Sequence, residues 1–348
     1  MLVGLPYGNI GNNHEIKKRG ALHPFFINKI RDCKAPSNFI IVSMWSIIIP
    51  TYNRLPILQK CLQSLEAQSF TQPYEVVVVD DGSTDGTVEF LQTHVDEFPH
   101  VRLILQNHEG AAIARNTGID VALGETIVFI DSDLVVTPVF LSAHAKALAR
   151  SDRAFTYGLV INTNNFENPT SEKIKIQDIS TAFFATGNVA IAKHWLIEAG
   201  KFDTSFRQYG WEDLELGVRL KNLGLKLIKC PDAAGYHWHP AFTIDQLPRL
   251  VDVEAQRGRM GVVFYKKHPT WTVRLMIQMT WLHVILWGVL SLGGLLNERS
   301  LRPLLKWLID QGKPQLALEI ARIFLNWYNV KGVYAAYRDD TNSIQAKS

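Results

Sequence analysis

The sequence predicts an α/β protein in which helices flank a mostly parallel β-sheet, with a helical region after it. Three observations support this fold class. Short apolar runs rich in Val and Ile alternate with amphipathic segments between residues 46 and 131. Polar and acidic residues follow several of the apolar runs directly. The 348 residues suffice for one large domain with a substantial core and an appendage.

The first half alternates regularly between predicted strands and helices. The run SIIIP at 46–50 is predicted as a strand, and LPILQKCLQSLEAQ at 55–68 as a helix with Leu58, Leu62 and Leu65 on one face. EVVVVD at 75–80 is the next strand. A helix at 84–94, a strand at 101–105, a helix at 110–123 and a strand at 125–131 follow. Such alternation is typical of a parallel sheet covered by helices.

After about residue 141 the alternation becomes irregular, which indicates mixed strands and loops with a different binding task. A helix is predicted from Trp211 to Leu223, ended by Gly224, and LKLIKC at 225–230 as a strand. Helices are predicted beyond residue 245. We therefore expect an N-terminal extension at 1–43, an α/β domain at 44–242 and, at 243–348, a helical region that is a candidate for membrane association.

The amino-acid composition limits the classes of binding partner and the compartment to be expected. The net charge is +3 without a long basic run, so nucleic acid is not an expected partner, whereas anionic small molecules and membrane surfaces are. Three widely spaced cysteines argue against a disulfide framework or a zinc site and favour a reducing compartment. The first twenty residues contain no basic leader followed by an apolar core. These features predict a cytoplasmic protein.

Four loops that begin near the ends of predicted strands contain residues suited to binding: PTYNR at 50–54, DDGSTD at 80–85, ARNTG at 114–118 and DSD at 131–133. Ligands of parallel sheets bind at the carboxyl ends of the strands, where these loops meet. In extended chain Asp131 and Asp133 point the same way and offer hard oxygen ligands to a divalent cation. DDGSTD alone would equally suit a solvated strand end followed by a helix cap.

Together the motifs SIIIPTYNR, VVVVDDGSTDGT, ARNTGI, FIDSD and GWEDLELGVRL resemble the inverting glycosyltransferases of family 2, which have the Rossmann-like GT-A fold. The resemblance runs from about residue 46 to 239. It implies a nucleotide-sugar donor, a divalent cation such as Mn²⁺ or Mg²⁺, and no covalent enzyme intermediate. GWEDLE is similar to the WED-type acceptor and base motif of galactosyltransferases.

The resemblance implies roles for the donor side. The first loop would cradle the nucleotide, and Asp81 would accept a hydrogen bond from uracil N3–H, a task suited to a carboxylate. Arg115 would bring positive charge toward the base or the diphosphate, although a surface Arg on a helix is the alternative. Asp133 would bind the metal, and Asp131 would face ribose or a metal-bound water. The first-loop residues concerned are Pro50, Thr51, Tyr52 and Asn53.

The second half would hold the acceptor. By resemblance Asp213 is the general base, Glu212 contacts the acceptor sugar and Trp211 is an apolar platform for its ring. The alternative is an acidic helix start in which Asp213 or Glu215 pairs with Arg219. Two further sets complete the predicted site: Gly187 and Asn188 as substrate-binding residues, and one of His237 and His239 as a metal ligand, with His237 favoured.

The segment Leu275–Leu296 contains no charged residue apart from His283, which titrates near neutrality. It is long enough for a spanning helix. A helix lying in the membrane interface, with its Trp residues at headgroup level, and a buried core helix are the alternatives.

The five motifs and the family resemblance that they carry predict a metal-dependent inverting hexosyltransferase. It would transfer a sugar, expected from a UDP-sugar, to a hydroxyl of a glycan or lipid-linked acceptor at the inner face of the cell membrane, in cell-envelope or extracellular polysaccharide synthesis. Two rivals remain open. A sugar-1-phosphate nucleotidyltransferase also uses a parallel sheet and acidic metal ligands, and a non-catalytic nucleotide-binding scaffold would keep the same fold.

Overall fold

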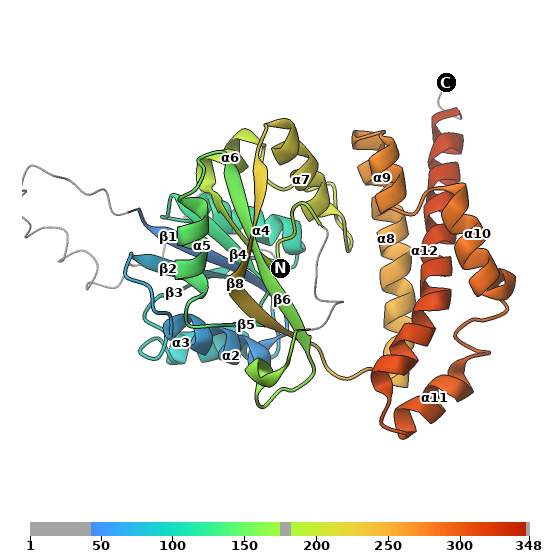
Figure 1. Ribbon diagram of the computed structural model, residues 1–348, viewed down its shortest axis with the longest axis horizontal. Helices are drawn as coiled ribbons and strands as arrows, with labels where there is room; N and C mark the ends of the chain where they lie inside the picture. The colour runs from blue at the N-terminus through green and yellow to red at the C-terminus, as the bar shows by residue number, and fades with distance from the viewer. Residues whose placement is uncertain (1–42, 175–181, 346–348) are drawn as a thin grey trace, which may run out of the picture. The chain divides into compact units, whose positions relative to one another are not determined.

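The computed structural model describes residues 43–174 and 182–345, so almost all of the predicted N-terminal extension lies outside the described residues. One eight-stranded sheet with the order β3-β2-β1-β4-β7-β6-β8-β5 forms its centre (Figure 1). The strands are β1 (Trp45–Thr51), β2 (Tyr74–Asp80), β3 (Val101–Leu105), β4 (Thr126–Ile130), β5 (Leu134–Val136), β6 (Ala154–Thr163), β7 (Asn188–Ala192) and β8 (Lys226–Trp238). The predicted α/β class is confirmed.

The first half of the sheet is parallel, as predicted: β1 pairs with β2 and β4, and β2 pairs with β3. Successive residues of β1 point to opposite faces, so that Ile47 and Ile49 enter one core and Ile48 the other. The first core lies under α2 (Leu55–Glu66), α3 (Thr87–Thr93) and α5 (Phe140–Leu148). The second lies under α4 (Ala111–Val121), α6 (Lys193–Glu198) and α7 (Glu212–Asn222).

The second half is mixed. β7 runs antiparallel to both β4 and β6, β5 runs antiparallel to β8, and only β6 and β8 are parallel to each other. These pairings bring distant segments to the carboxyl edge of the first half. Ile130 at the end of β4 pairs with Asn188, and Leu134 pairs with His237. The DSD loop therefore lies between the starts of β5 and β7 and the end of β8.

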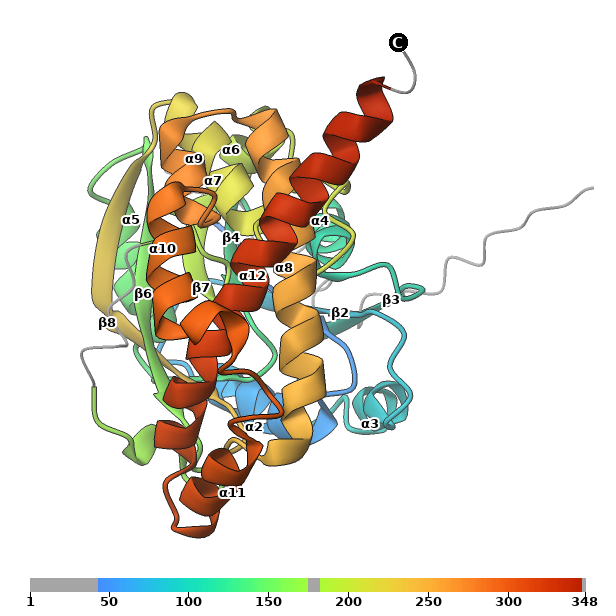
Figure 2. The same cartoon turned by 90° about the vertical axis from the view of Figure 1, so that its right-hand side faces the viewer.

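The C-terminal region consists of helices, as predicted: α8 (Leu247–Lys267), α9 (Trp271–Met276), α10 (Trp281–Leu290), α11 (Arg302–Asp310) and α12 (Pro314–Gln345), with the short 3₁₀ helices η3 (Ile244–Gln246) and η4 (Leu292–Gly294). Figure 2 shows α12 crossing α8 and α10, and it packs against both. A further hydrophobic cluster, separate from the two cores of the sheet, joins α8, α9 and α12 to Phe206 and Trp211 of the α/β domain.

One segment, Trp271–Leu290, is long and apolar enough to cross a membrane by length and composition, and 22% of it is buried. It forms two helices, however, because the chain turns between α9 and α10 and Gln278 adopts a left-handed φ of 60°. The predicted continuous apolar segment 275–296 is therefore broken.

Candidate active site

A cluster of three potential metal ligands lies where β4, β5 and β8 meet. Asp133, His237 and His239 each offer one ligand atom, and these atoms lie within 4.8 Å of one another. The Nε2 atom of His237 is 2.8 Å from Oδ1 of Asp133, and Nη1 of Arg54 is 2.8 Å from Oδ2. One buried carboxylate thus gathers two imidazoles and a guanidinium.

The surroundings set the charge of this cluster. Burial raises the pKa of the Asp133 carboxyl, but the hydrogen bond from His237 and the charges of His237 and Arg54 outweigh it, so the pKa is lowered. Burial and the neighbouring charge of His237 lower the pKa of His239 to about 4. Asp133 is therefore ionised and His239 neutral at neutral pH, which are the protonation states that metal binding needs. Burial lowers the pKa of His237, but the hydrogen bond to Asp133 and the Asp133 charge outweigh it and raise that pKa, so a metal that binds His237 has to displace its proton.

This donor set fits a divalent cation. One carboxylate oxygen and two imidazole nitrogens suit Mn²⁺ and related metals, and three protein ligands leave positions for other oxygens. Both histidines lie with Asp133, so the choice between His237 and His239 made from the sequence is unnecessary: the two can act together. Arg54, at 2.8 Å from the carboxylate, is the residue that a bound cation would displace or stand beside.

Arg115 is buried and connects the two halves of the site. Its Nη1 lies 3.0 Å from Oε1 of Glu212 at the start of α7, and its Nη2 lies 3.3 Å from Oδ1 of Asp131 after β4. Its guanidinium also lies over the ring of Phe202. The surface-Arg alternative is excluded, because only 7% of this side chain is exposed. Arg115 therefore fixes the distance between the DSD loop and the acidic helix start.

Asp213 is partly buried on the first turn of α7, and its Oδ1 accepts a hydrogen bond from the N–H of Leu214. Burial and the charge of Glu212 raise its pKa to about 7, against the opposing charge of Arg115. The dipole at the start of α7 favours the ionised form of this carboxyl, but burial and the Glu212 charge outweigh it. A carboxyl poised near neutrality is suited to take and release a proton. Glu215, by contrast, is buried and paired with Arg219 and His268.

The turn before α7 corrects the role expected of Trp211. Gly210 and Trp211 both have left-handed φ values, of 104° and 77°, which a Trp rarely adopts. The Trp211 indole is held by a 2.8 Å hydrogen bond from Nε1 to the carbonyl of Arg257, whose guanidinium covers the ring. Only 7% of Trp211 is exposed, so it anchors the helix start to α8 and cannot be an open platform for a sugar.

The structure also corrects Asn188. This residue is fully buried, its Nδ2 donates to the carbonyls of Leu159 and Ala233, and its Oδ1 lies 2.9 Å from Nε2 of His144. All of its polar capacity is used inside the protein. Gly187 does lie at the site: a Cβ atom there would be 3.1 Å from Oδ2 of Asp131, so the missing side chain leaves the DSD loop its space.

The first loop is tied to the loop after β2. The side-chain oxygen of Asn53 accepts from the N–H of Thr84 at 2.7 Å, and the N–H of Asn53 donates to Oγ of Ser83 at 2.9 Å. Asn53 therefore shapes the loops. Pro50 and Thr51 end β1 beside Asp80, and the hydroxyl of Thr51 is buried without a partner in the described structure.

Asp81 has more partners than the sequence suggests. Its Oδ1 accepts from Nε2 of Gln106 and from the N–H of Glu109, at 2.7 and 2.9 Å. Its Oδ2 accepts from the N–H of Gly110 at 3.0 Å and lies 2.9 Å from Nδ1 of His108. These contacts fill about four acceptor positions, the capacity of a carboxylate. Asp81 thus holds the loop after β3, while Asp80 holds the N–H groups of its own loop.

The His108 ring occupies the space in front of Tyr52. The two rings stack with centroids 4.1 Å apart and planes 23° apart, and the His108 side chain is 58% exposed. A flat ring therefore lies on Tyr52 with a ring nitrogen facing Asp81. Neither His108 nor Arg54 was assigned a role from the sequence. Arg54 lies within the PTYNR loop, and His108 follows β3, whose carboxyl end lies at the same edge; the predicted loop at 114–118 is instead part of helix α4.

In comparisons with known proteins, residues 46–209 match the family described as "Glycosyl transferase family 2". A chondroitin synthase from Escherichia coli is 28% identical over 250 residues, which are 59% of this chain and 36% of that protein. A hyaluronan synthase from Pasteurella multocida is 28% identical over 271 residues, 64% of this chain and 28% of its own length. The chain thus spans about a third of these relatives.

Among solved structures, the mannosyltransferase PcManGT from Pyrobaculum calidifontis, in complex with GDP-Man and Mn²⁺, has a similar fold. The TM-score is 0.54 at 19% identity, and the alignment covers 82% of this chain and 86% of that one. The likeness confirms the predicted GT-A fold with its helical C-terminal region.

Proposed function

Since residues 46–209 belong to glycosyltransferase family 2, we propose that this protein transfers a sugar, with inversion, from a nucleotide sugar to an acceptor hydroxyl. One observation carries the proposal: Arg115 pairs with Glu212, the neighbour of Asp213, whose pKa lies near neutrality, and with Asp131 of the loop that supplies the metal ligand Asp133. A proton acceptor and a site for a diphosphate are thereby held at opposite sides of one buried guanidinium.

The reaction needs a single displacement. Asp213 takes the proton of the acceptor hydroxyl, the oxygen attacks the anomeric carbon from the side opposite the diphosphate, and the bond to the diphosphate breaks. Asp133, His237 and His239 would hold a divalent cation, whose positive charge would stabilise the diphosphate as it leaves. Glu212, held by Arg115, is placed to accept a hydrogen bond from the acceptor sugar.

For the donor we propose a uridine nucleotide. The His108 ring supports this proposal, because its face stacks on Tyr52 and its Nδ1 lies 2.9 Å from the Asp81 carboxylate. Uracil, with its N3–H, would replace the imidazole in this place. The mannosyltransferase was solved with GDP-Man, so GDP-sugars belong in the same binding test.

The acceptor and the cellular site are proposed from the relatives and from the C-terminal helices. Two relatives are named as polysaccharide synthases, which favours a growing glycan or a lipid-linked sugar as acceptor in cell-envelope or extracellular polysaccharide synthesis. The exposed apolar side chains of α10 favour contact with a membrane surface, for which we propose the cytoplasmic face.

The test is a panel of UDP- and GDP-sugars incubated with Mn²⁺ or Mg²⁺, with and without glycan acceptors. We expect a nucleoside diphosphate to be released only in the presence of the metal. Pyrophosphate exchange with a nucleoside triphosphate and a sugar phosphate would instead identify a nucleotidyltransferase. Nucleotide binding without turnover of any donor would identify a scaffold.

A further inference from the structure

Helix α10 has an unusual surface. Its sequence, WLHVILWGVL, is apolar on every side, and none of its ten residues is buried. Trp281, Ile285 and Val289 are exposed by 63%, 56% and 66%. Other large exposed apolar residues of the same region are Trp271, Leu275, Met276, Leu282, Leu286, Leu290, Leu292, Leu295, Leu304 and Trp307. So many large apolar side chains exposed within one region mark a binding surface.

The length of α10 excludes one role for it. Ten residues of helix extend about 15 Å, half of the roughly 30 Å of a bilayer's hydrocarbon core. The turn around Gln278 prevents α9 and α10 from forming one straight helix. An apolar helix that is exposed and too short to span fits the boundary between headgroups and acyl chains.

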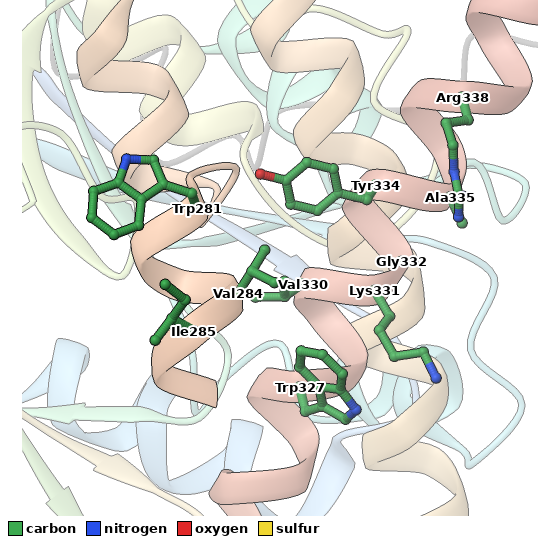
Figure 3. A pocket seen from close by; sticks show the side chains of 10 residues that line it. All are labelled: Trp281, Val284, Ile285, Trp327, Val330, Lys331, Gly332, Tyr334, Ala335 and Arg338. Carbon is green, nitrogen blue, oxygen red and sulfur yellow. The ribbon is translucent and has the colours of Figure 1, made fainter. Parts of the chain in front are cut away.

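A groove of about 720 Å³ runs between α10 and α12. Figure 3 shows Trp281 and Ile285 of α10 at one side, Lys331 and Arg338 of α12 at the other, and apolar side chains between them. The lining residues are Trp281, Val284, Ile285, Trp327, Val330, Lys331, Gly332, Tyr334, Ala335 and Arg338. An apolar floor with two cations at its edge matches a molecule with an apolar chain and an anionic head.

The side chains of Lys331 and Arg338 are free to bind an anionic head group. Lys331 and Arg338 lie seven residues apart on one helix, about 10 Å along its axis, and both are exposed. Neither has a carboxylate partner within the part of the chain that the structure describes. The Lys331 ammonium instead lies 5.9 Å from the centre of the Trp327 ring.

The net charge of the C-terminal helices also favours an anionic ligand. The segment from Trp271 to Arg338 contains eight Lys and Arg residues and three Asp and Glu residues, whereas the entire chain has a net charge of only +3. The segment that carries the exposed apolar side chains therefore also carries a surplus of basic residues. Anionic lipid attracts such a surface, while two copies of it facing each other would repel.

We propose that the α10–α12 groove binds an anionic phospholipid of the bilayer surface. An acyl chain packs against Trp281, Val284 and Val330, the phosphate is bound by Lys331 and Arg338, and α10 lies in the interface. The proposal rests on the membrane association proposed above and is independent of the transferase reaction, because none of these residues belongs to the active site.

The charge contribution is tested with the full chain and vesicles of phosphatidylcholine, alone or mixed with phosphatidylglycerol. Sedimentation should show binding to the mixed vesicles. We expect Lys331→Gln and Arg338→Gln each to lower the partition coefficient about fivefold, and the pair about 25-fold, as about 1 kcal/mol per basic side chain implies. The matched control is Arg322→Gln: Arg322 is exposed on α12, about 160° around the helix from Arg338, and should have little effect.

The apolar contribution is tested with Ile285→Glu, which should abolish vesicle binding. Its matched control is Ile197→Glu, because Ile197 is similarly exposed, 51% against 56%, but lies on α6 of the α/β domain. Phosphatidylglycerol with brominated acyl chains should quench tryptophan fluorescence, and Trp281→Phe should reduce the quenching. Donor hydrolysis should be unchanged in every variant, so that loss of lipid binding is distinguished from loss of the enzyme.

Three results would overturn the proposal. The first is equal binding to the two kinds of vesicle, or none. The second is unchanged binding in the Lys331 and Arg338 double variant. The third is a dimer in sedimentation equilibrium that Ile285→Glu dissociates, since a second copy would then cover the face. A chain that binds anionic vesicles but turns over no donor would contradict the proposed function and leave this inference standing.

Discussion

Replacing Asp213 by Asn should reduce turnover without weakening nucleotide binding. The amide keeps the size of the side chain but cannot take a proton, and a positioned general base is worth about 10²–10⁴-fold in rate. We expect kcat to fall by that range, with the affinity for UDP nearly unchanged, since Asp213 lies on α7 whereas the proposed nucleotide contacts lie on the loops after β1 and β2. Asp120→Asn on the exposed face of α4 is the matched control.

The dependence of kcat/KM on pH in the native enzyme tests the role of Asp213 in a second way. With a pKa of about 7, Asp213 is half deprotonated near neutrality, so kcat/KM should fall about tenfold for each unit of pH below it. Burial and the Glu212 charge raise this pKa, while Arg115 opposes the increase and Asp131 adds to it. Glu212→Gln removes a raising charge, so the midpoint should move to lower pH.

The lower kcat of Asp213→Asn and the pH dependence can both be measured by donor hydrolysis before the acceptor is known, because water then takes the place of the acceptor. Once an acceptor is found, NMR assigns the anomer of the product. Near-normal kcat in Asp213→Asn would show that this carboxyl is not the base. A product with the donor's anomeric configuration, or a midpoint that Glu212→Gln leaves in place, would also contradict the prediction.

Four further outcomes are expected. Asp133→Ala should lower UDP affinity in Mn²⁺ about tenfold or more, to the value without metal, and calorimetry that shows no change would remove the metal site. Asp81→Asn should weaken UDP binding about tenfold and CDP binding less, in a competition assay, because an amide loses charge-assisted bonds. His108→Ala should tighten UDP binding several-fold if the imidazole occupies the place of uracil, whereas weaker binding would make His108 a partner of the base. Finally, the raised pKa of Asp213 in the folded protein means that its ionisation destabilises the fold, so stability is lost as the pH rises toward and through about 7. Asp213→Asn should therefore have a higher melting temperature than the native protein at pH about 8, by roughly 2–4 °C per kcal/mol. This difference in melting temperature should shrink in acid.

Local patterns in the sequence predicted the first half of the fold. The strands and helices between residues 45 and 130 follow directly from apolar periodicity, and Leu58, Leu62 and Leu65 are buried as expected. The topology of a parallel sheet then brought the loops at 50–54, 80–85 and 131–133 to one edge. Each of these inferences depends on neighbours in sequence or on a general rule of sheet topology.

Contacts between distant segments could not be predicted in the same way. Asp81 faces the loop after β3, and Asp133 faces Arg54, because of side-chain packing that no local pattern encodes. Trp211 stands beside two acids in the sequence, yet its left-handed backbone directs the indole into the α8 interface. The break at Gln278 likewise follows from a single left-handed residue within an otherwise apolar run.

The proposed function requires that this protein breaks the bond between a sugar and a nucleoside diphosphate. This step can be followed by ³¹P NMR of the full chain incubated with a panel of nucleotide sugars, Mg²⁺ and glycan acceptors, because Mg²⁺ is diamagnetic and leaves the phosphorus signals sharp. We expect the signals of one donor to be replaced by those of its free nucleoside diphosphate, and Asp133→Ala to prevent the change. Formation of pyrophosphate, or every donor remaining intact, would show that the protein is not the proposed transferase.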